Sequence, residues 1–224
     1  MELKVLDFGV SEYRDIWTEQ CNIQSYLVGC KKEHIPVETE YLLVGEHPSV
    51  YTIGFHGDIT NLKVSKEELN REGVECIRIE RGGDITYHGP GQMIAYPIID
   101  LENHGLGVKG YVALLEDCII RLLEEYDIKG ETIEGATGVW IGKGTDRERK
   151  ICAIGVKCTR FITMHGLALN VNTDLTAFNA INPCGFTDKG VTSISAETGR
   201  QIDMNTLKEK FVAIFKELHM KTAI

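Results

Sequence analysis

The sequence predicts an α/β (α+β) fold in which helices flank a mixed β-sheet. The chain has 224 residues, a length that fits one domain. Its composition, 43% hydrophobic and 25% charged residues, provides a core and is unlike that of disordered or fibrous chains. Strand-like segments dominate the middle of the chain and helical segments flank them, which favours helices packed on a sheet. No linker or internal repeat divides the sequence, so we expect residues 1–224 to form a single domain.

Short strands and two helices are expected in the first hundred residues. In chain order, the pattern predicts a strand, a helix, two strands around a Glu-His-Pro turn, a short helix and two further strands, over residues 3–8, 11–31, 40–53, 65–70, 76–80 and 92–99. Ser11 is a candidate N-cap for the first helix. Ser65 and Glu68 have the spacing of a capping box, which marks the start of the second helix.

The clearest helix covers residues 109–126. Its apolar side chains recur at intervals of three and four residues, as on one buried face: Val112, Leu115, Ile119, Leu122 and Tyr126. Three strands are expected next, and then two helices, over residues 137–142, 151–158, 163–171, a short stretch after Asp174, and about 205–219. These elements complete a sheet in the middle of the chain with helices on either side.

Charge and hydropathy exclude two broad classes of function. The net charge is −9, which is a poor basis for binding nucleic acid through its phosphates. The N-terminal residues are charged throughout and no apolar run approaches the length of a membrane span, so we expect a cytoplasmic protein without a membrane partner. Five basic residues lie close in sequence and predict either a docking patch for an acidic partner or an ordinary solvated loop: Arg147, Arg149, Lys150, Lys157 and Arg160.

The seven cysteines favour free thiols. Their number is odd, their spacing is irregular and no Cys-x-x-Cys motif occurs, which speaks against structural zinc and against a disulfide framework. Six of them fall in helical or strand-like segments. Cys184 instead stands between Pro183 and Gly185, in a turn that would present the thiol rather than bury it. It is therefore the best candidate for a nucleophilic cysteine.

Three further segments carry polar groups in unusual positions. Residues 81–92 are rich in glycine between two expected strands, and they form either a tight turn or a loop that approaches a ligand closely. Lys150 stands just before an apolar strand, where it is either exposed or at the mouth of a pocket. His165 interrupts an apolar alternation, but such histidines are more often satisfied core residues, so the pattern alone assigns it no chemistry.

Taken together and in this order, these segments resemble the octanoyltransferase family of lipoate biosynthesis. The matching stretches are GEHPSVYTIG, RGGDITYHGPGQMIAYPIIDL, GATGVWIG, RKICAIGV, MHGLALNVNTDL, INPCGF and GVTSIS. They span roughly residues 41–195, about two-thirds of the chain. The combination of RGG-x-x-TYHGPGQ with a downstream Pro-Cys-Gly is highly specific.

The resemblance implies a fold, a reaction and a set of residues. The fold would be that of the catalytic domain of biotin and lipoate protein ligases. The reaction would move an octanoyl group from octanoyl-acyl carrier protein, through a thioester on Cys184 assisted by Lys150, to a lysine of a lipoyl domain. Acceptors would be 2-oxoacid dehydrogenase subunits and the glycine-cleavage H protein. The substrate-binding residues would be Arg81, Gly82, Gly83, Asp84, Ile85, Thr86, Tyr87, His88, Ala153, Ile154, Gly155, Gly166, Leu167 and Ala168. His165 is a further pocket candidate, and we expect a monomer that uses neither a cofactor nor a metal.

Some positions depart from the family pattern, and other functions remain open. Phe55-His56 stand where an arginine commonly follows glycine, Cys152 replaces an alanine, and residues 143–148 look inserted. The nearest alternative is a lipoate protein ligase that activates a free acid with ATP. A relay amidotransferase, taking octanoyl from H protein, would use the same cysteine and lysine. A noncatalytic lipoyl-domain binding protein and a cysteine protease pairing His165 with Cys184 are further alternatives.

Overall fold

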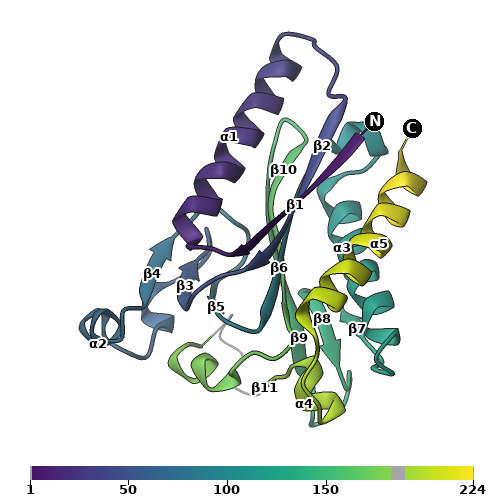
Figure 1. Ribbon diagram of the computed structural model, residues 1–224. Helices are drawn as coiled ribbons and strands as arrows, with labels where there is room; N and C mark the ends of the chain where they lie inside the picture. Colours follow the sequence, from purple (N-terminus) through teal and green to yellow (C-terminus); the bar gives the residue numbers. More distant parts are fainter. Residues whose placement is uncertain (1, 183–189, 224) are drawn as a thin grey trace.

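A large mixed β-sheet forms the centre of the molecule (Figure 1). The computed structural model describes residues 2–182 and 190–223, apart from the side chains of Lys66 and Asn70. The strand order is β1-β2-β6-β10-β9-β8-β7, and β11 pairs with β9. The bounds are β1 (Glu2–Val10), β2 (Thr39–Glu46), β6 (Gln92–Ile98), β7 (Glu131–Ile133), β8 (Ala136–Ile141), β9 (Arg149–Thr159), β10 (Ile162–Asn170) and β11 (Gly190–Val191). The β1–β2 and β9–β11 pairs are parallel and the others are antiparallel.

A second, three-stranded sheet has the order β4-β3-β5. Its strands are β3 (Val50–Ile53), β4 (Glu75–Arg78) and β5 (Ile85–His88). Tyr51, Ile85 and Tyr87 form its core together with Ile181. The short helices η1 (Ile59–Asn61) and α2 (Lys66–Arg71) lie between β3 and β4 in the chain, and α2 packs against β4. The short helix η3 (Leu175–Ala180) packs against β5.

Helices cover both faces of the large sheet (Figure 1). On one face α1 (Tyr13–Lys32) packs Ile23 and Leu27 against Ile94 and Ile98. On the other face α3 (Val108–Glu124) and α5 (Met204–Thr222) build the main core. Two further short helices are η2 (Leu101–His104) and α4 (Ile194–Thr198). In the described part of the chain, no helix combines the length and the apolarity that crossing a membrane requires.

The predicted fold class is confirmed, but two local predictions are wrong. Residues 85–88 form β5 rather than part of a loop, so the sequence pattern did not reveal the second sheet. This strand is only four residues long and is flanked by glycines, which leaves no alternation to detect. Ser11 does not cap α1, because its hydroxyl donates to the Phe8 carbonyl. The capping box is confirmed, since the Ser65 amide donates to Glu68 Oε2 at 2.8 Å.

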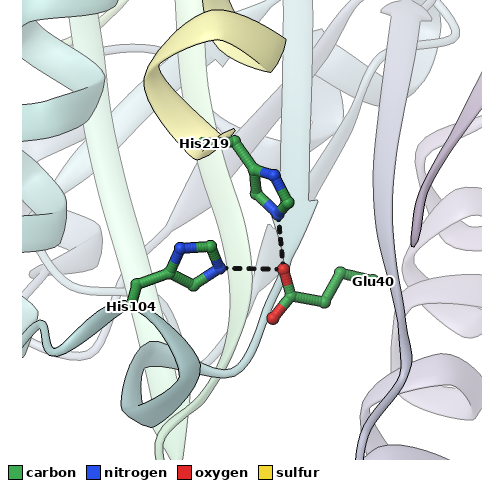
Figure 2. Close-up of side chains that lie close together, drawn as sticks. All are labelled: Glu40, His104 and His219. Carbon is green, nitrogen blue, oxygen red and sulfur yellow. Dashed lines mark hydrogen bonds and ion pairs between the residues drawn. The ribbon is translucent and has the colours of Figure 1, made fainter. Parts of the chain in front are cut away.

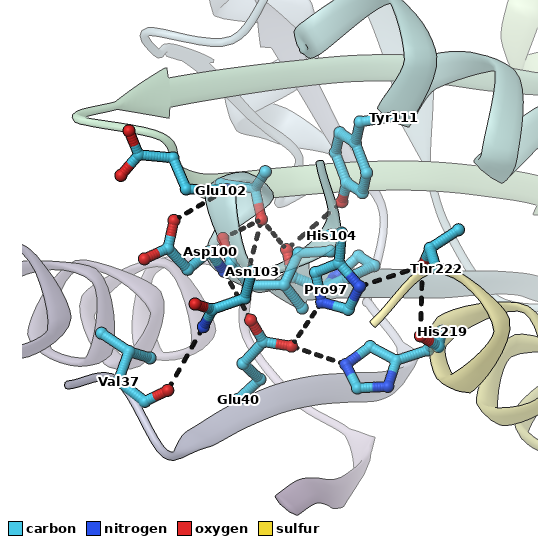
Figure 3. Close-up of polar contacts among 12 residues, drawn as sticks. Val37, Glu40, Pro97, Asp100, Glu102, Asn103, His104, Tyr111, His219 and Thr222 are labelled. Atoms are coloured by element: carbon cyan, nitrogen blue, oxygen red, sulfur yellow. Dashed lines mark hydrogen bonds and ion pairs between the residues drawn. The ribbon is translucent and has the colours of Figure 1, made fainter. Parts of the chain in front are cut away.

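A buried carboxylate fastens the end of α5 to the sheet (Figure 2). Glu40 Oε2 accepts hydrogen bonds from His104 Nε2 at 2.9 Å and His219 Nε2 at 2.5 Å. Figure 3 shows the surrounding contacts, in which Glu40 Oε1 accepts from the Asp100 amide at 2.7 Å and His104 Nδ1 contacts Thr222 Oγ1 at 2.9 Å. The Glu40 carboxylate and the imidazole rings of His104 and His219 are all buried. We refer to Glu40, His104 and His219 as the Glu40 clasp.

The spacing within the Glu40 clasp favours hydrogen bonding over metal coordination. Two imidazoles and a carboxylate are a ligand set that zinc accepts. Ligands each about 2.0–2.1 Å from a tetrahedral zinc ion lie about 3.3 Å from one another. The separations of 2.5 and 2.9 Å in the clasp are shorter than that. Burial raises the pKa of Glu40, but the hydrogen bonds from both histidines and from the Asp100 amide outweigh it and hold this pKa below its ordinary value.

Replacing Glu40 with glutamine should destabilise the fold. The Glu40→Gln substitution replaces one carboxylate oxygen with an NH2 donor, so either the two imidazoles or the Asp100 amide lose their acceptor, at a cost of roughly 3 kcal/mol in the free energy of unfolding. Because the folded pKa is lowered, the wild-type contribution is complete above pH 4.5, the ordinary value of a glutamate, and disappears as the pH falls through the folded pKa. Urea unfolding at pH 7 and pH 3 measures both effects, with exposed Glu38→Gln as control. An equal loss for the two variants at pH 7 would contradict the clasp.

Two glycines face each other where β9 and β10 pass beneath residues 81–83. Gly155 pairs with Gly166 in the β9–β10 register. A Cβ on Gly155 would lie 2.8 Å from the Gly82 carbonyl oxygen, and one on Gly166 would lie 2.2 Å from the Ala95 oxygen. The Gly82 amide donates to the Val156 carbonyl at 3.0 Å. The absence of side chains here therefore lets residues 81–83 rest directly on the large sheet.

Gly155→Ala and Gly82→Ala should have different effects at this contact. The alanine methyl at 155 forces backbone apart, and overpacking of this kind costs about 1–3 kcal/mol. A Cβ at Gly82 would be 3.4 Å from the Val156 oxygen, an ordinary contact, and Gly82 has no positive φ, so this control should be near neutral. Thermal unfolding of the two variants is the measurement. Equal melting temperatures would show that the contact is not tight.

Candidate active site

A cavity of about 600 Å³ lies on β9 at the junction of the two sheets. Its wall is mainly apolar and is built by residues 81–86, the start of α3, the start of β8 and the middle of β9. The lining residues are Arg81, Gly82, Gly83, Asp84, Ile85, Thr86, Gln92, Val108, Val112, Gly135, Ala136, Thr137, Lys150, Ala153, Ile154, Gly155, Val156, Ala168, Asn170, Phe178 and Val191. An apolar wall with a few polar groups is the usual composition of a small-molecule site.

A smaller chamber of about 50 Å³ adjoins this cavity. It lies toward α1 and does not include Lys150. Its lining residues are Tyr13, Arg81, Thr86, His88, Tyr96, Ala153, Ile154, Gly155, His165, Gly166, Leu167 and Ala168. The two spaces share a wall in which Ala153 and Gly155 stand opposite Arg81 and Thr86. We call this smaller space the inner chamber.

A β-bulge positions Lys150 in the main cavity. Val139 pairs with Cys152, whereas the next residue of β8, Trp140, pairs with Lys150, so β9 carries one extra residue here. Bulges of this kind redirect side chains and are frequent beside active sites. The Lys150 Nζ donates to the Thr137 carbonyl at 3.0 Å and lies 4.6 Å from the centre of the Trp140 ring. Val191 on β11 pairs with Lys150 and also lines the cavity.

A chain of buried hydrogen bonds begins at Arg81 and holds the wall in place. Arg81 Nη2 donates to the Thr52 carbonyl at 2.8 Å and to Thr52 Oγ1 at 3.0 Å. Thr52 Oγ1 lies 3.3 Å from His88 Nε2. Because the Thr52 hydroxyl oxygen already accepts from Arg81, its own O–H donates to His88 Nε2. The guanidinium is thereby fixed on the small sheet while it faces the cavity.

The same chain continues into the large sheet. His88 Nδ1 contacts Gln92 Oε1 at 2.9 Å, which fits the tautomer with the proton on Nδ1. Gln92 Nε2 donates to Asn170 Oδ1 at 2.9 Å, and Asn170 Nδ2 donates to the Thr192 carbonyl at 3.0 Å. We call the whole chain, from Arg81 through Thr52, His88, Gln92 and Asn170 to Thr192, the buried relay. Both nitrogens of His88 are occupied in it, so His88 shapes the wall.

Burial keeps the histidines of the site neutral. Desolvation, together with the nearby His47 and Arg81, lowers the pKa of His88 to about 3. Burial likewise lowers the pKa of His47 to about 4 and, with Arg81, that of His165 to about 3. Lys150 brings an amine into the wall of the main cavity, and an amine is one of the side-chain groups that can transfer protons in catalysis.

His165 differs from the other histidines because its ring has no hydrogen-bond partner. Both ring nitrogens are buried and unpaired in the part of the chain that the structure describes. Its backbone has φ of 60°, and its amide donates to Gln20 Oε1 at 3.0 Å. The ring packs edge-on against Tyr96 at 6.4 Å between centroids. This left-handed backbone conformation interrupts the regular strand geometry at His165. The side chain therefore departs from the inward and outward alternation along the strand.

The structure brings most of the predicted site residues together. Of residues 81–88, all except Tyr87 line one of the two spaces, as do residues 153–155 and 165–168 and Lys150. Tyr87 instead packs in the small sheet, where its hydroxyl contacts Ser49 at 2.9 Å. The predicted nucleophile Cys184 lies outside the described residues. Whether these residues bind substrate or act in catalysis stays a prediction.

Several lining residues were not among the predicted site residues. Val112 was predicted only as part of a buried helix face, but it faces the cavity. Other additions come from distant elements: Tyr13, Gln92, Tyr96, Val108, Gly135, Ala136, Thr137, Asn170, Phe178 and Val191. Their proximity depends on long-range strand pairing, which no local motif encodes.

The basic residues of the 147–160 segment do not form one patch. Arg149 pairs with Glu197 at 2.6 Å, and Lys157 pairs with Glu80. Arg147 precedes β9 and Arg160 follows it, so the strand separates them by about 30 Å. These five residues are therefore spread along β9 and do not form one compact basic patch. Of these five basic residues, Lys150 is the one that lines the cavity.

Burial makes four of the described cysteines poor nucleophiles. Burial raises the pKa of Cys118 and Cys152 above the ordinary value, and the same effect acts on Cys21 and Cys158. A raised pKa keeps these four thiols protonated and unreactive.

Comparison with known proteins identifies the family. A family model described as lipoyl protein ligase A/B catalytic domain matches residues 17–216. The octanoyltransferase of Bacteroides fragilis is 48% identical over 210 residues, covering 94% of this chain and 95% of that protein. The octanoyltransferase of Parabacteroides distasonis is 54% identical over 182 residues, covering 81% and 82%. That of Christiangramia forsetii is 45% identical over 223 residues, covering 97% and 95%.

Solved structures with the same fold are protein ligases. A bi-partite lipoate protein ligase from Thermoplasma acidophilum superposes with a TM-score of 0.73 at 14% identity, covering 98% of this chain and 84% of that one. A biotin protein ligase from Aquifex aeolicus superposes with a TM-score of 0.53 at 14% identity, covering 98% and 71%. The expected ligase-like fold is confirmed. The chain therefore belongs to the lipoyl protein ligase A/B catalytic domain family and, within it, is an acyltransferase of the octanoyltransferase family.

Proposed function

We propose that this chain takes an octanoyl group from octanoyl-acyl carrier protein onto Cys184 and passes it to a lysine of a lipoyl domain. The observation that carries the proposal is the apolar cavity with Lys150 in its wall. Val191, which follows Cys184 by seven residues, pairs with Lys150. The named octanoyltransferases, 48% and 54% identical to this chain, support the acyl group and its destination.

The first half-reaction exchanges one thioester for another. The Cys184 sulfur attacks the acyl carbonyl, and the bond from that carbonyl to the carrier thiol breaks. A free cysteine has a pKa of about 8.5, so only a small fraction is thiolate at neutral pH. Lys150 accepts the thiol proton and returns it to the departing carrier thiol. Protons and electrons balance without ATP, because a thioester replaces a thioester.

The second half-reaction forms an amide. The acceptor lysine has an ordinary pKa of about 10.4 and is almost fully protonated at neutral pH. It must lose protons before and after it attacks the Cys184 thioester, and Lys150 serves as the base. The Cys184 thiol is released protonated. Backbone amides such as that of Gly155 are candidate donors to the tetrahedral oxyanion.

The acceptors, the compartment and the oligomeric state are further parts of this proposal. We infer that the lipoyl domains are those of 2-oxoacid dehydrogenase subunits and the glycine-cleavage H protein, and that the reaction occurs in the cytoplasm on a monomer. An ATP-dependent ligase of the same fold would need no cysteine thioester. A relay enzyme would accept octanoyl from H protein but not from the acyl carrier protein.

Acylation of the protein should be visible by mass. After mixing with octanoyl-acyl carrier protein and no ATP, the intact protein should gain one octanoyl group, because Cys184 retains it as a thioester. Cys184→Ser should show no gain, and Cys152→Ser on the same chain should behave like the wild type. Adding a lipoyl domain should discharge the adduct. Acylation that requires ATP and free octanoate would favour the ligase instead.

Substitutions of Lys150 should separate its charge from its basicity. Lys150→Ala should slow both half-reactions by about 10²- to 10⁴-fold, the usual range for a lost general base. Lys150→Arg keeps the charge but cannot release a proton, so it should be as slow. Lys157→Ala, on the same strand but outside the cavity, is the control. Single-turnover rates measure each step, and rapid turnover of Lys150→Arg would rule out the base.

A further inference from the structure

We propose that Glu116 is a positioning residue for Lys150. Its carboxylate accepts a hydrogen bond from the Gly138 amide at 3.0 Å, and this bond anchors residues 136–138, the segment of β8 that holds the lysine amine. This role rests on the proposed function, because it assumes that Lys150 transfers protons. It belongs to a residue of α3 that stands behind the cavity wall, in none of the sequence motifs.

Two contacts of the Lys150 amine depend on residues 136–138. Thr137 provides the carbonyl that accepts from Lys150 Nζ at 3.0 Å. The Trp140 ring lies 4.6 Å from the same nitrogen, and its own Nε1 donates to the Ala136 carbonyl at 2.8 Å. A shift of this short segment would therefore move the carbonyl and the ring together, and the amine with them.

Gly138 lies where the strand pairing of β8 is irregular on both sides. The register with β9 shifts directly after Val139, and the register with β7 shifts between Glu131 and Ile133. Gly138 has a φ of 118°, and a Cβ there would lie 2.4 Å from the Cys152 carbonyl oxygen. Because the regular ladder is interrupted at this point, a side chain from α3 supplies an acceptor for the Gly138 amide.

The position of Glu116 on α3 brings its carboxylate to this amide. Val108, Val112 and Ile120 are spaced from it by multiples of four residues, so they share one row of the helix and make the rest of that row apolar. The helix packs against β8 and β9. Glu116 is half-buried, and the hydrogen bond from Gly138 offsets the cost of desolvating its carboxylate. An apolar residue would cover the same surface without that cost, so the carboxylate points to a role beyond packing.

Two substitutions separate the reach of the Glu116 side chain from its charge. Glu116→Gln keeps the length and an oxygen that can accept from Gly138, so it should retain most of the wild-type rate. Glu116→Asp keeps the charge but is one methylene too short, so the segment is released. Since a misplacement of about 1 Å can cost about 100-fold, Glu116→Asp should slow both half-reactions by about 10- to 100-fold.

Single-turnover rates with octanoyl-acyl carrier protein and a lipoyl domain measure both half-reactions. The control is Asp117→Asn on the same helix, because Asp117 pairs with Arg121 at 2.9 Å on the surface and should not affect the rate. A fast Glu116→Asp protein beside a slow Glu116→Gln protein would show that the charge acts instead of the reach, and would overturn the proposal.

The Lys150→Ala background tells whether Glu116 acts through the lysine. Without the amine there is nothing to position, so adding Glu116→Asp to Lys150→Ala should cause no further loss of rate. A general weakening of the structure would instead lower the rate by the same factor in both backgrounds. Equal factors would therefore overturn the positioning role.

This inference and the proposed function fail in different ways. If Lys150→Ala transfers octanoyl as fast as the wild type, the proposed role of Lys150 is wrong and the role of Glu116 falls with it. If Lys150→Ala is slow while Glu116→Asp keeps the wild-type rate, only the inference about Glu116 is overturned. Should Glu116→Asp fail to fold, Glu116→Ala replaces it with the same expected loss, since alanine is the strongest helix former.

Discussion

The buried relay from Arg81 to Thr192 is the interaction on which the rest of the site depends. It begins on the small sheet, crosses β5 and β6, and ends beside β11, so it ties the two sheets together at the cavity. Each residue of the relay forms a hydrogen bond with the next. Replacing any one of these side chains with an apolar residue would leave buried donors or acceptors of its neighbours unpaired. The relay also explains why a cationic guanidinium is tolerated in a mainly apolar wall, since Thr52 accepts two of its hydrogen bonds.

Close backbone contact complements this network. Gly155 and Gly166 occupy paired positions on the central strands, and no Cβ fits at either. The cavity wall is therefore partly main chain, which presents amides and carbonyls at fixed positions. Lys150 lines the main cavity beside the bulge, whereas His165 lines the inner chamber.

The local elements were predictable from the sequence, whereas the geometry of the site was not. The periodicity of α3 and the capping box at Ser65 are local signals, and both are confirmed. The motif at 81–92 indicated a ligand loop but not that it contains β5, because strand pairing is set by residues distant in sequence. The unpaired ring of His165 depends on a left-handed backbone that its strand pattern did not indicate. The basic residues near 150 are adjacent along the chain, but an extended strand carries them apart.

The Glu40 clasp has a consequence for how the chain folds during synthesis. Glu40 and Asp7 belong to the first strands of the sheet, yet their partners His219 and Lys208 lie on α5, near the other end of the sequence (Figure 1). A ribosome releases the chain from its N-terminus, so β1 and β2 emerge long before α5. Until then, Glu40 lacks the hydrogen bond from His219 and one face of the sheet lacks its last helix. Completion of this face of the sheet therefore waits for α5, and until that helix packs, the apolar side chains that it covers stay exposed to solvent.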